Sequence, residues 1–171
     1  MVVLRPTRRL LPALPPTVPV ESVSDTALGD WYVNRLVVDR RPLLLLTSAR
    51  GLLPILAPAR DVRTLPARLK GLVVARLHRL NVAPRVIDAE CAAMVPVCVA
   101  KTTDRSVLGS LVDFAFQVEA HLEPGAWDET TLPFVEGRLA ETPCHASRRL
   151  EDVIWPVAAA PKLLEARWGQ G

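Results

Sequence analysis

Five stretches of the chain carry the short apolar or alternating pattern that is typical of β-strands. Side chains alternate between two faces along Trp31–Val38, and Leu43–Thr47 is an apolar run suited to a strand covered on both faces. Leu52–Leu56 follows after another short turn, so these three stretches are predicted to form an antiparallel meander. The same reasoning predicts strands at Val2–Arg5 and Val95–Ala100.

Apolar residues at helical spacing predict two long helices, Thr64–Leu80 and Val107–Leu122. Arg85–Ala93 fits either a short strand or a helix, because its periodicity does not separate the two. After the break at Glu123-Pro124-Gly125 the composition changes and shorter helical pieces are predicted at Thr130–Ala140, Ser147–Ile154 and Val157–Arg167.

Together these elements predict an α+β fold. We expect an antiparallel sheet of four or five strands with helices packed mainly on one face, plus a helical C-terminal tail. A chain of 171 residues is long enough for one domain with its own core. The break after residue 122 divides the prediction into an α+β core domain at 1–122 and a helical C-terminal appendage at 123–171.

The composition is that of a globular chain, with 50% hydrophobic and 23% charged residues. No apolar run reaches the length of about 18 residues that a transmembrane helix needs, so no membrane partner is expected. At the N-terminus the apolar residues precede the first arginines, which is the reverse of the order in a secretory signal. We therefore expect a cytoplasmic protein.

Charge is distributed unevenly along the chain. Residues 1–105 carry 16 Lys and Arg against 8 Asp and Glu, a balance of +8, whereas residues 106–171 carry 5 against 10, a balance of −5. Such segregation favours a polyanionic partner, or an acidic tail that folds back on a basic body.

No motif of a known catalytic or metal centre is present. The three cysteines form no CxxC pair and the three histidines lack metal-ligand spacing, so no metal and no cofactor are expected. A Ser–Lys dyad of Lys101 with Ser106 or Ser110 would lack a defined oxyanion hole. A metal-independent nuclease built on Lys101, Arg105, Tyr32 and Asp30 is chemically feasible, and whether the protein is an enzyme stays open.

The stretch Lys101–Ser110 lies between a predicted strand and a predicted helix. It is read as a helix cap by Thr103 or Asp104, or as an anion site in which Lys101 and Arg105 hold a phosphate or carboxylate. The stretch Leu28–Asn34 is read as a turn entering a strand, or as a groove wall in which an exposed Tyr32 stacks on a base beside Asn34.

Three stretches in this order, Leu4–Leu11, Leu28–Asn34 and Lys101–Ser110, resemble a family of small bacterial proteins known only as a domain of unknown function, DUF6933. The resemblance covers about residues 1–120 and leaves out the tail; it departs at Arg9, where Lys is expected, and at Leu111-Val112-Asp113, where Met-Asn-Asp is expected. It implies no activity. It does imply that certain residues share one region: Thr7, Arg9, Asp30, Trp31, Tyr32, Asn34, Lys101, Thr103, Arg105, Ser106 and Gly109.

The leading functional hypothesis is a non-catalytic binding protein that recognises a polyanion such as nucleic acid through Arg5, Arg9, Tyr32, Asn34, Lys101 and Arg105. The full candidate ligand-binding set is Thr7, Arg9, Asp30, Tyr32, Asn34, Lys101, Thr103, Arg105, Ser106 and Ser110. Two alternatives are a small phosphate-ester-cleaving enzyme, nuclease-like and of the toxin–antitoxin or defence kind, and a module for a protein partner that displaces the acidic tail. The oligomeric state is not predicted.

Overall fold

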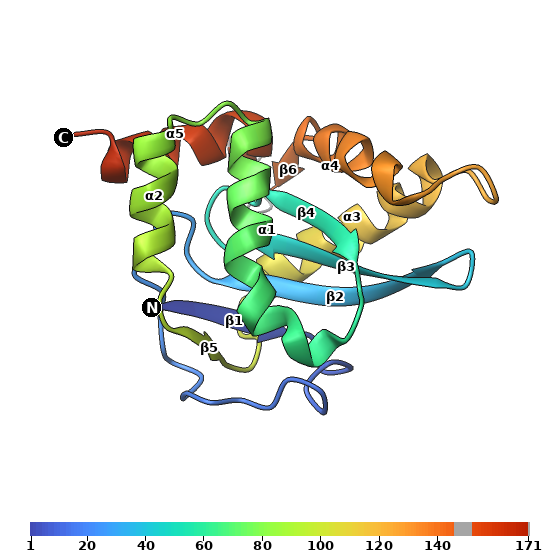
Figure 1. Ribbon diagram of the computed structural model, residues 1–171, viewed down its shortest axis with the longest axis horizontal. Helices are drawn as coiled ribbons and strands as arrows, with labels where there is room; N and C mark the ends of the chain where they lie inside the picture. Colours follow the sequence, from blue (N-terminus) through green and yellow to red (C-terminus); the bar gives the residue numbers. More distant parts are fainter. Residues whose placement is uncertain (146–151, 171) are drawn as a thin grey trace.

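The computed structural model describes residues 1–145 and 152–170. A five-stranded sheet with the order β4-β3-β2-β1-β5 forms its centre (Figure 1). Its strands are β1 (Val2–Pro6), β2 (Trp31–Val38), β3 (Arg41–Ser48), β4 (Pro54–Pro58) and β5 (Val97–Val99). The helices are η1 (Val62–Thr64), α1 (Leu65–Arg79), α2 (Pro84–Ala93), α3 (Arg105–His121), η2 (Glu129–Thr131), α4 (Leu132–Ala140) and α5 (Pro156–Trp168). The predicted α+β fold is confirmed.

The sheet is mixed, whereas a purely antiparallel sheet was expected. The meander β2-β3-β4 is antiparallel as predicted, but β1 pairs in parallel with both β2 and β5. A parallel pair requires a long connection, and the chain supplies one in each case: residues 7–30 before β2, and helices α1 and α2 before β5. The period of a strand indicates its faces and not its direction, so the sequence pattern could not distinguish these pairings.

Helices cover both faces of the sheet, and the expectation that they pack mainly on one face is wrong. One buried cluster joins the sheet to α1, α2 and α5, while a second joins it to α3 and α4. The physical reason lies in β3, where the run Leu43–Leu46 is buried on both sides and needs an apolar partner for each. Residues 85–93, undecided from the sequence, lie in α2.

Residues after 122 contribute to both cores. Val135 and Leu139 of α4 belong to one buried cluster, and Ala160 and Leu164 of α5 belong to the other. The division into a core domain at 1–122 and an appendage at 123–171 stays a prediction. The helix predicted over 147–154 lies mostly outside the described residues; its last two residues form β7 (Val153–Ile154), which pairs with β6 (Cys144–His145).

Across the described residues, no helix combines the length and the apolar character that crossing a membrane would need.

The outer edge of β4 is closed to further strands. Pro54 and Pro58 have no N–H, and the Leu56 N–H donates to the buried carboxylate of Glu136 at 2.8 Å. The Pro54 carbonyl accepts from Arg76 at 3.1 Å, and the Pro58 carbonyl accepts from Arg68 at 3.4 Å. A partner therefore cannot dock by adding a strand at the β4 edge.

Candidate functional site

Several of the residues predicted to share one region lie at the edge of the sheet where β1 and β5 end, whereas Trp31 is buried in the cluster that joins the sheet to α1. Arg5 lies beneath this edge and is only 2% exposed. Its guanidinium donates to Asp30 Oδ2 at 2.5 Å, to the Lys101 carbonyl at 2.5 Å and to the Ser22 carbonyl at 2.6 Å. All three of its nitrogens are occupied within the protein, so Arg5 joins three segments of the chain and is not available to bind a phosphate.

Asp30 and Tyr32 are also engaged internally. Asp30 Oδ1 accepts from the Ser24 N–H at 3.1 Å and from the Ser24 hydroxyl at 2.7 Å. Tyr32 is 1% exposed, and its hydroxyl accepts from the Asp104 N–H at 3.1 Å and lies 3.4 Å from Thr103 Oγ1. Because the Tyr32 ring is buried, it offers no surface on which a base could stack, contrary to the exposed ring considered from the sequence.

The helix cap predicted at the start of α3 is confirmed, with Asp104 as its N-cap. The Asp104 carboxylate accepts from the Ser106 N–H at 2.8 Å and from the Val107 N–H at 3.2 Å. A carboxylate of the protein therefore occupies the place at this helix terminus where a bound anion would sit. The anion site proposed for this turn stays a prediction that depends on the exposed side chains around it.

Exposed cations surround the same edge of the sheet. Arg8 and Arg9 follow β1, and Lys101 follows β5; all three side chains are exposed and form no ion pair in the described part of the chain. We call Arg8, Arg9 and Lys101 the cationic edge. Beside it, the Thr7 hydroxyl donates to Asn34 Oδ1 at 3.1 Å, which fixes the amide next to the end of β1.

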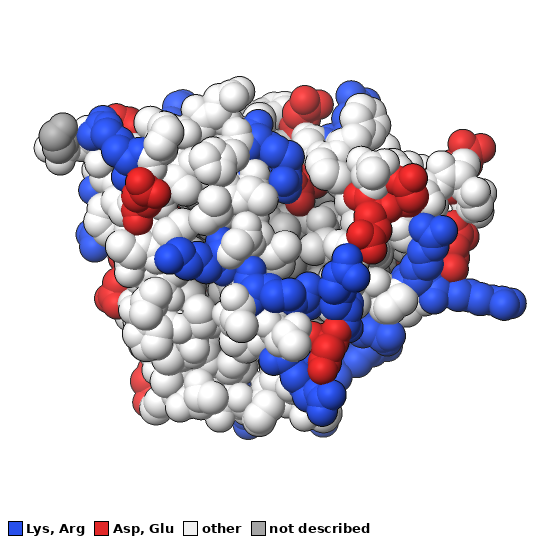
Figure 2. Space-filling view, viewed as in Figure 1, with Lys and Arg blue, Asp and Glu red and all other residues white. Residues whose placement is uncertain are grey.

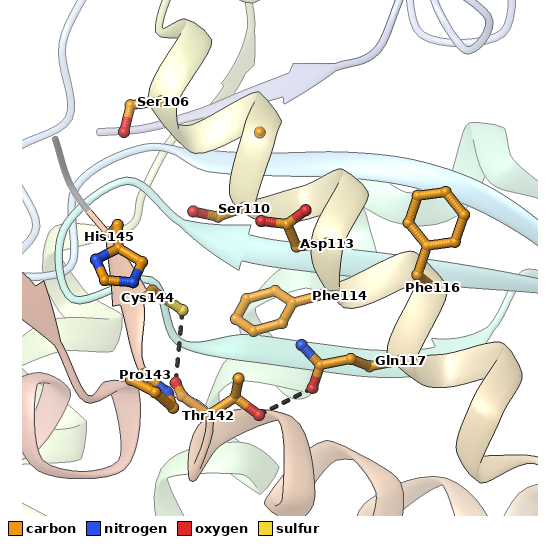
Figure 3. Close-up of a pocket in the computed structure, with 11 residues that line it drawn as sticks. Ser106, Ser110, Asp113, Phe114, Phe116, Gln117, Thr142, Pro143, Cys144 and His145 are labelled. Atoms are coloured by element: carbon orange, nitrogen blue, oxygen red, sulfur yellow. Dashed lines mark hydrogen bonds between the residues drawn. The ribbon is translucent and has the colours of Figure 1, made fainter. Parts of the chain in front are cut away.

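A groove of about 640 Å³ begins at the first turns of α3 (Figure 3). One wall comes from α3, including the predicted residues Ser106 and Ser110, and the other comes from residues 142–145. Gln117 accepts a hydrogen bond from the Thr142 hydroxyl at 2.8 Å across the groove, and Figure 3 shows Ser110 and Asp113 on the α3 side. The second wall could not be predicted, because residues 142–145 carry no motif and lie far from α3 along the chain.

The groove contains a thiol that is poorly suited to nucleophilic chemistry. Burial and the nearby Asp113 carboxylate raise the pKa of Cys144 to about 11, so the thiol is protonated at neutral pH. Its sulfur donates to the Thr142 carbonyl at 3.6 Å. Within residues 1–145 and 152–170, no group of three or more His, Cys, Asp or Glu side chains is arranged to hold a metal ion.

A second group of cations lies over η1 and the first turns of α1. We call Arg60, Arg63 and Lys70 the cationic face; Figure 2 shows Lys and Arg side chains gathered in a band across this part of the molecule. Arg68 lies beside them and, like Arg5, is engaged internally: its guanidinium donates to Thr64 Oγ1 at 3.0 Å, to the Ala59 carbonyl at 2.7 Å and to the Pro58 carbonyl at 3.4 Å. Partial burial and the neighbouring charge of Arg60 lower the pKa of Arg68. Like charges are therefore crowded here, although exposed ion pairs of Arg60 with Glu129 at 3.3 Å and of Arg63 with Asp61 at 3.0 Å balance part of the charge.

The cationic edge and the cationic face are connected through the core. Leu10 and Leu14, which follow the two arginines of the edge, belong to the same buried cluster as Leu65 and Leu69 of α1. The turn that carries Arg8 and Arg9 therefore packs on the side of the sheet that α1 covers. The residues of the cationic face were not among the predicted site residues, because their proximity depends on η1 and on packing that no local motif reveals.

The uneven charge of the chain is partly balanced inside the molecule. Glu136 of α4 is completely buried and pairs with Arg76 at 3.2 Å and Arg79 at 2.5 Å. Glu165 of α5 lies 3.7 Å from Arg85. Carboxylates of the acidic C-terminal part thus pair with arginines of the basic part, and among the described residues none of them pairs with the cationic edge.

Comparison with known proteins identifies one family. The model of DUF6933, a domain of unknown function, matches residues 3–159. The match continues well past residue 123, where the resemblance was expected to end, and so includes the second wall of the groove. Neither a curated protein nor a solved structure matches the chain.

Proposed function

The chain belongs to the DUF6933 family, whose domain has no known function, and we propose from its surface that it is a non-catalytic binding protein for an anionic polymer, with nucleic acid as the ligand. The observation that carries this proposal is the presence of two groups of exposed cations, the cationic edge and the cationic face, the second of which lies in the band of Lys and Arg side chains in Figure 2. Arg8 and Arg9 are exposed on the edge, and no carboxylate of residues 1–145 or 152–170 forms an ion pair with either of them.

The electrostatics of the cationic face favour a phosphate ligand. Crowded like charges raise the free energy of the unbound protein, and each phosphate that enters between them relieves this repulsion. The ion pairs of Arg60 and Arg63 are exposed, and such pairs contribute only about 0–1 kcal/mol each, so exchanging a carboxylate for a phosphate has a small cost. The planar guanidinium groups suit a phosphodiester, which accepts two parallel hydrogen bonds.

The groove beside α3 suits the bases better than the phosphates. Asp113 lines it, and a carboxylate repels a phosphate but accepts a hydrogen bond from the amino group of a base. Ser110 and Gln117 add a hydroxyl and an amide that hydrogen-bond with base edges. We therefore assign the polymer backbone to the cationic edge and the cationic face and leave the groove for unpaired bases.

The experiment measures the affinity of the full chain for a fluorescent single-stranded oligonucleotide across a salt series. The chain has three lysines, which allows three composition-matched double variants. Arg9→Ala with Lys101→Ala removes charge from the edge, Arg63→Ala with Lys70→Ala removes it from the face, and Lys162→Ala with Arg167→Ala removes it from α5 as the control. Each variant lowers the net charge by the same amount, so a difference among them reports position.

We expect the edge and face variants each to bind more weakly and to lower the slope of log K against log salt by about 2, because each of the two removed cations neutralises about one phosphate. The α5 variant is expected to keep the slope of the unmodified chain. Equal weakening in all three variants would show that net charge alone sets the affinity and would contradict the assigned positions. An absence of salt-dependent binding would overturn the proposal. The length of the probe is followed in the same samples, since cleavage would favour the phosphate-ester-cleaving enzyme instead.

A further inference from the structure

Helix α3 leaves a partly apolar stripe uncovered on its outer surface. Val112 is 51% exposed and Phe116 is 69% exposed, which is unusual for two apolar side chains one helical turn apart. With Arg105, Leu108 and Glu119 they follow the three- and four-residue spacing of a single helix face. The stripe is therefore apolar in its centre and oppositely charged at its two ends.

The two terminal charges have no partner within the described residues. Arg105 lies in the first turn of α3 and Glu119 near its last turn, both exposed and neither in an ion pair. They are separated by fourteen positions, or about 21 Å along the helix axis. Arg105 and Glu119 lie equally far from Val112, seven positions before it and seven after it, and Leu108 and Phe116 lie four positions on either side.

We propose that this stripe is the interface of a symmetric homodimer in which two copies of α3 pack antiparallel. A two-fold axis at Val112 places this residue against its own copy, and places Leu108 against Phe116 of the second copy. The same axis brings Arg105 of each copy to Glu119 of the other, so both unpaired charges gain a partner. The assignment takes Arg105 out of the polyanion site and places Phe116, which also lines the groove beside α3, at the dimer interface.

The order of charged and apolar residues along the stripe fits a second copy of this chain better than it fits another kind of partner. An isologous interface has to be complementary to itself, and this stripe has that property about a single residue. A parallel arrangement would instead set Arg105 against Arg105 and Glu119 against Glu119, which electrostatic repulsion disfavours. A nucleic acid on this stripe would bring its phosphates close to the exposed Glu119 carboxylate, which repels them.

The test measures molar mass by light scattering and sedimentation over a concentration series, with circular dichroism to confirm folding. The unmodified chain is expected to dimerise. Arg105→Glu and Glu119→Arg each convert two attractive contacts into two repulsive ones, so each variant alone should dimerise at least about tenfold more weakly. An equimolar mixture of the two variants should recover a dimer, because every charged contact in the mixed pair is again between opposite charges.

Crosslinking tests the position of the axis. Val112→Cys should form a disulfide-linked dimer under mild oxidation, since the two thiols face each other across the axis, whereas Ala120→Cys on the same helix should not. Either of two results would overturn the proposal: a chain that stays monomeric at all concentrations, or a dimer that neither charge reversal weakens and that the mixture does not restore.

Discussion

Beneath the edge of the sheet, Arg5 is buried and its guanidinium donates to three oxygens, whereas Arg9, four positions along the chain, is exposed and forms no ion pair in the described residues. The same contrast separates Arg76, buried beside Glu136, from Lys101. Arg5 and Arg76 hold segments of the chain together, whereas Arg9 and Lys101 lie exposed at the surface.

This contrast shows how far a count of charges can be interpreted. The balance of +8 in residues 1–105 includes arginines whose charge is used inside the fold and cations whose charge is available outside it. A charge that is buried with its partner contributes to stability and specificity of packing, while one at the surface contributes to long-range attraction. Substitutions that remove one kind of charge or the other should therefore differ in their effect on stability.

The largest effect is expected at Glu136. Glu136→Ala removes the acceptor for the Leu56 N–H, leaves the buried Arg76 without its counter-charge and removes the partner of the more exposed Arg79. We expect the free energy of unfolding to fall by an amount near the top of the range of about 3–5 kcal/mol for a broken buried pair. Urea unfolding measures it, and Glu129→Ala, which removes the exposed partner of Arg60, is the matched control and should cost no more than about 1 kcal/mol.

Arg5→Ala should have the next largest effect. The substitution leaves the Asp30 carboxylate and two backbone carbonyls without their donor, but Asp30 keeps its hydrogen bonds from Ser24 and has some access to water. We therefore expect a loss near the lower end of the same range, about 3 kcal/mol. Equal urea midpoints for Arg5→Ala and the unmodified chain would contradict the structural role assigned to Arg5.

Arg5 and Arg9 also show which features of the structure the sequence could not predict. The strands, the two long helices and the Asp104 cap follow from periodicity and local capping, which the sequence carries directly. The parallel pairing of β1 depends on the long connections to its neighbours, and the covering of both faces of the sheet by helices depends on packing between residues far apart in the sequence. Arg5 and Arg9 are the same residue type in one predicted cluster, and only the fold decides that one is enclosed by three acceptors while the other faces solvent.

A smaller effect, dependent on pH, is expected at Cys144. Its pKa is about 11 in the folded chain and lower in the unfolded chain, where the thiol is solvated. Below the unfolded pKa both states are protonated, so stability is unaffected; as the pH rises from about 9 towards 11 only the unfolded state loses its proton, and stability falls. Urea unfolding between about pH 8 and pH 11, values chosen to bracket this window, should show a shallower decline for Cys144→Ala, and a parallel decline would contradict the assignment.

The smallest effect on stability is expected at the cationic edge, which completes the comparison. Arg9→Ala with Lys101→Ala removes two exposed cations that have no counter-charge in the described residues, so the free energy of unfolding should stay within about 0.5 kcal/mol of the unmodified value. Because the double variant is also predicted to weaken nucleic-acid binding, the two measurements together separate a ligand site from a structural one. A loss of stability above about 1 kcal/mol would instead show that Arg9 and Lys101 have a structural role like that of Arg5, which is to hold β1 and β5 in register.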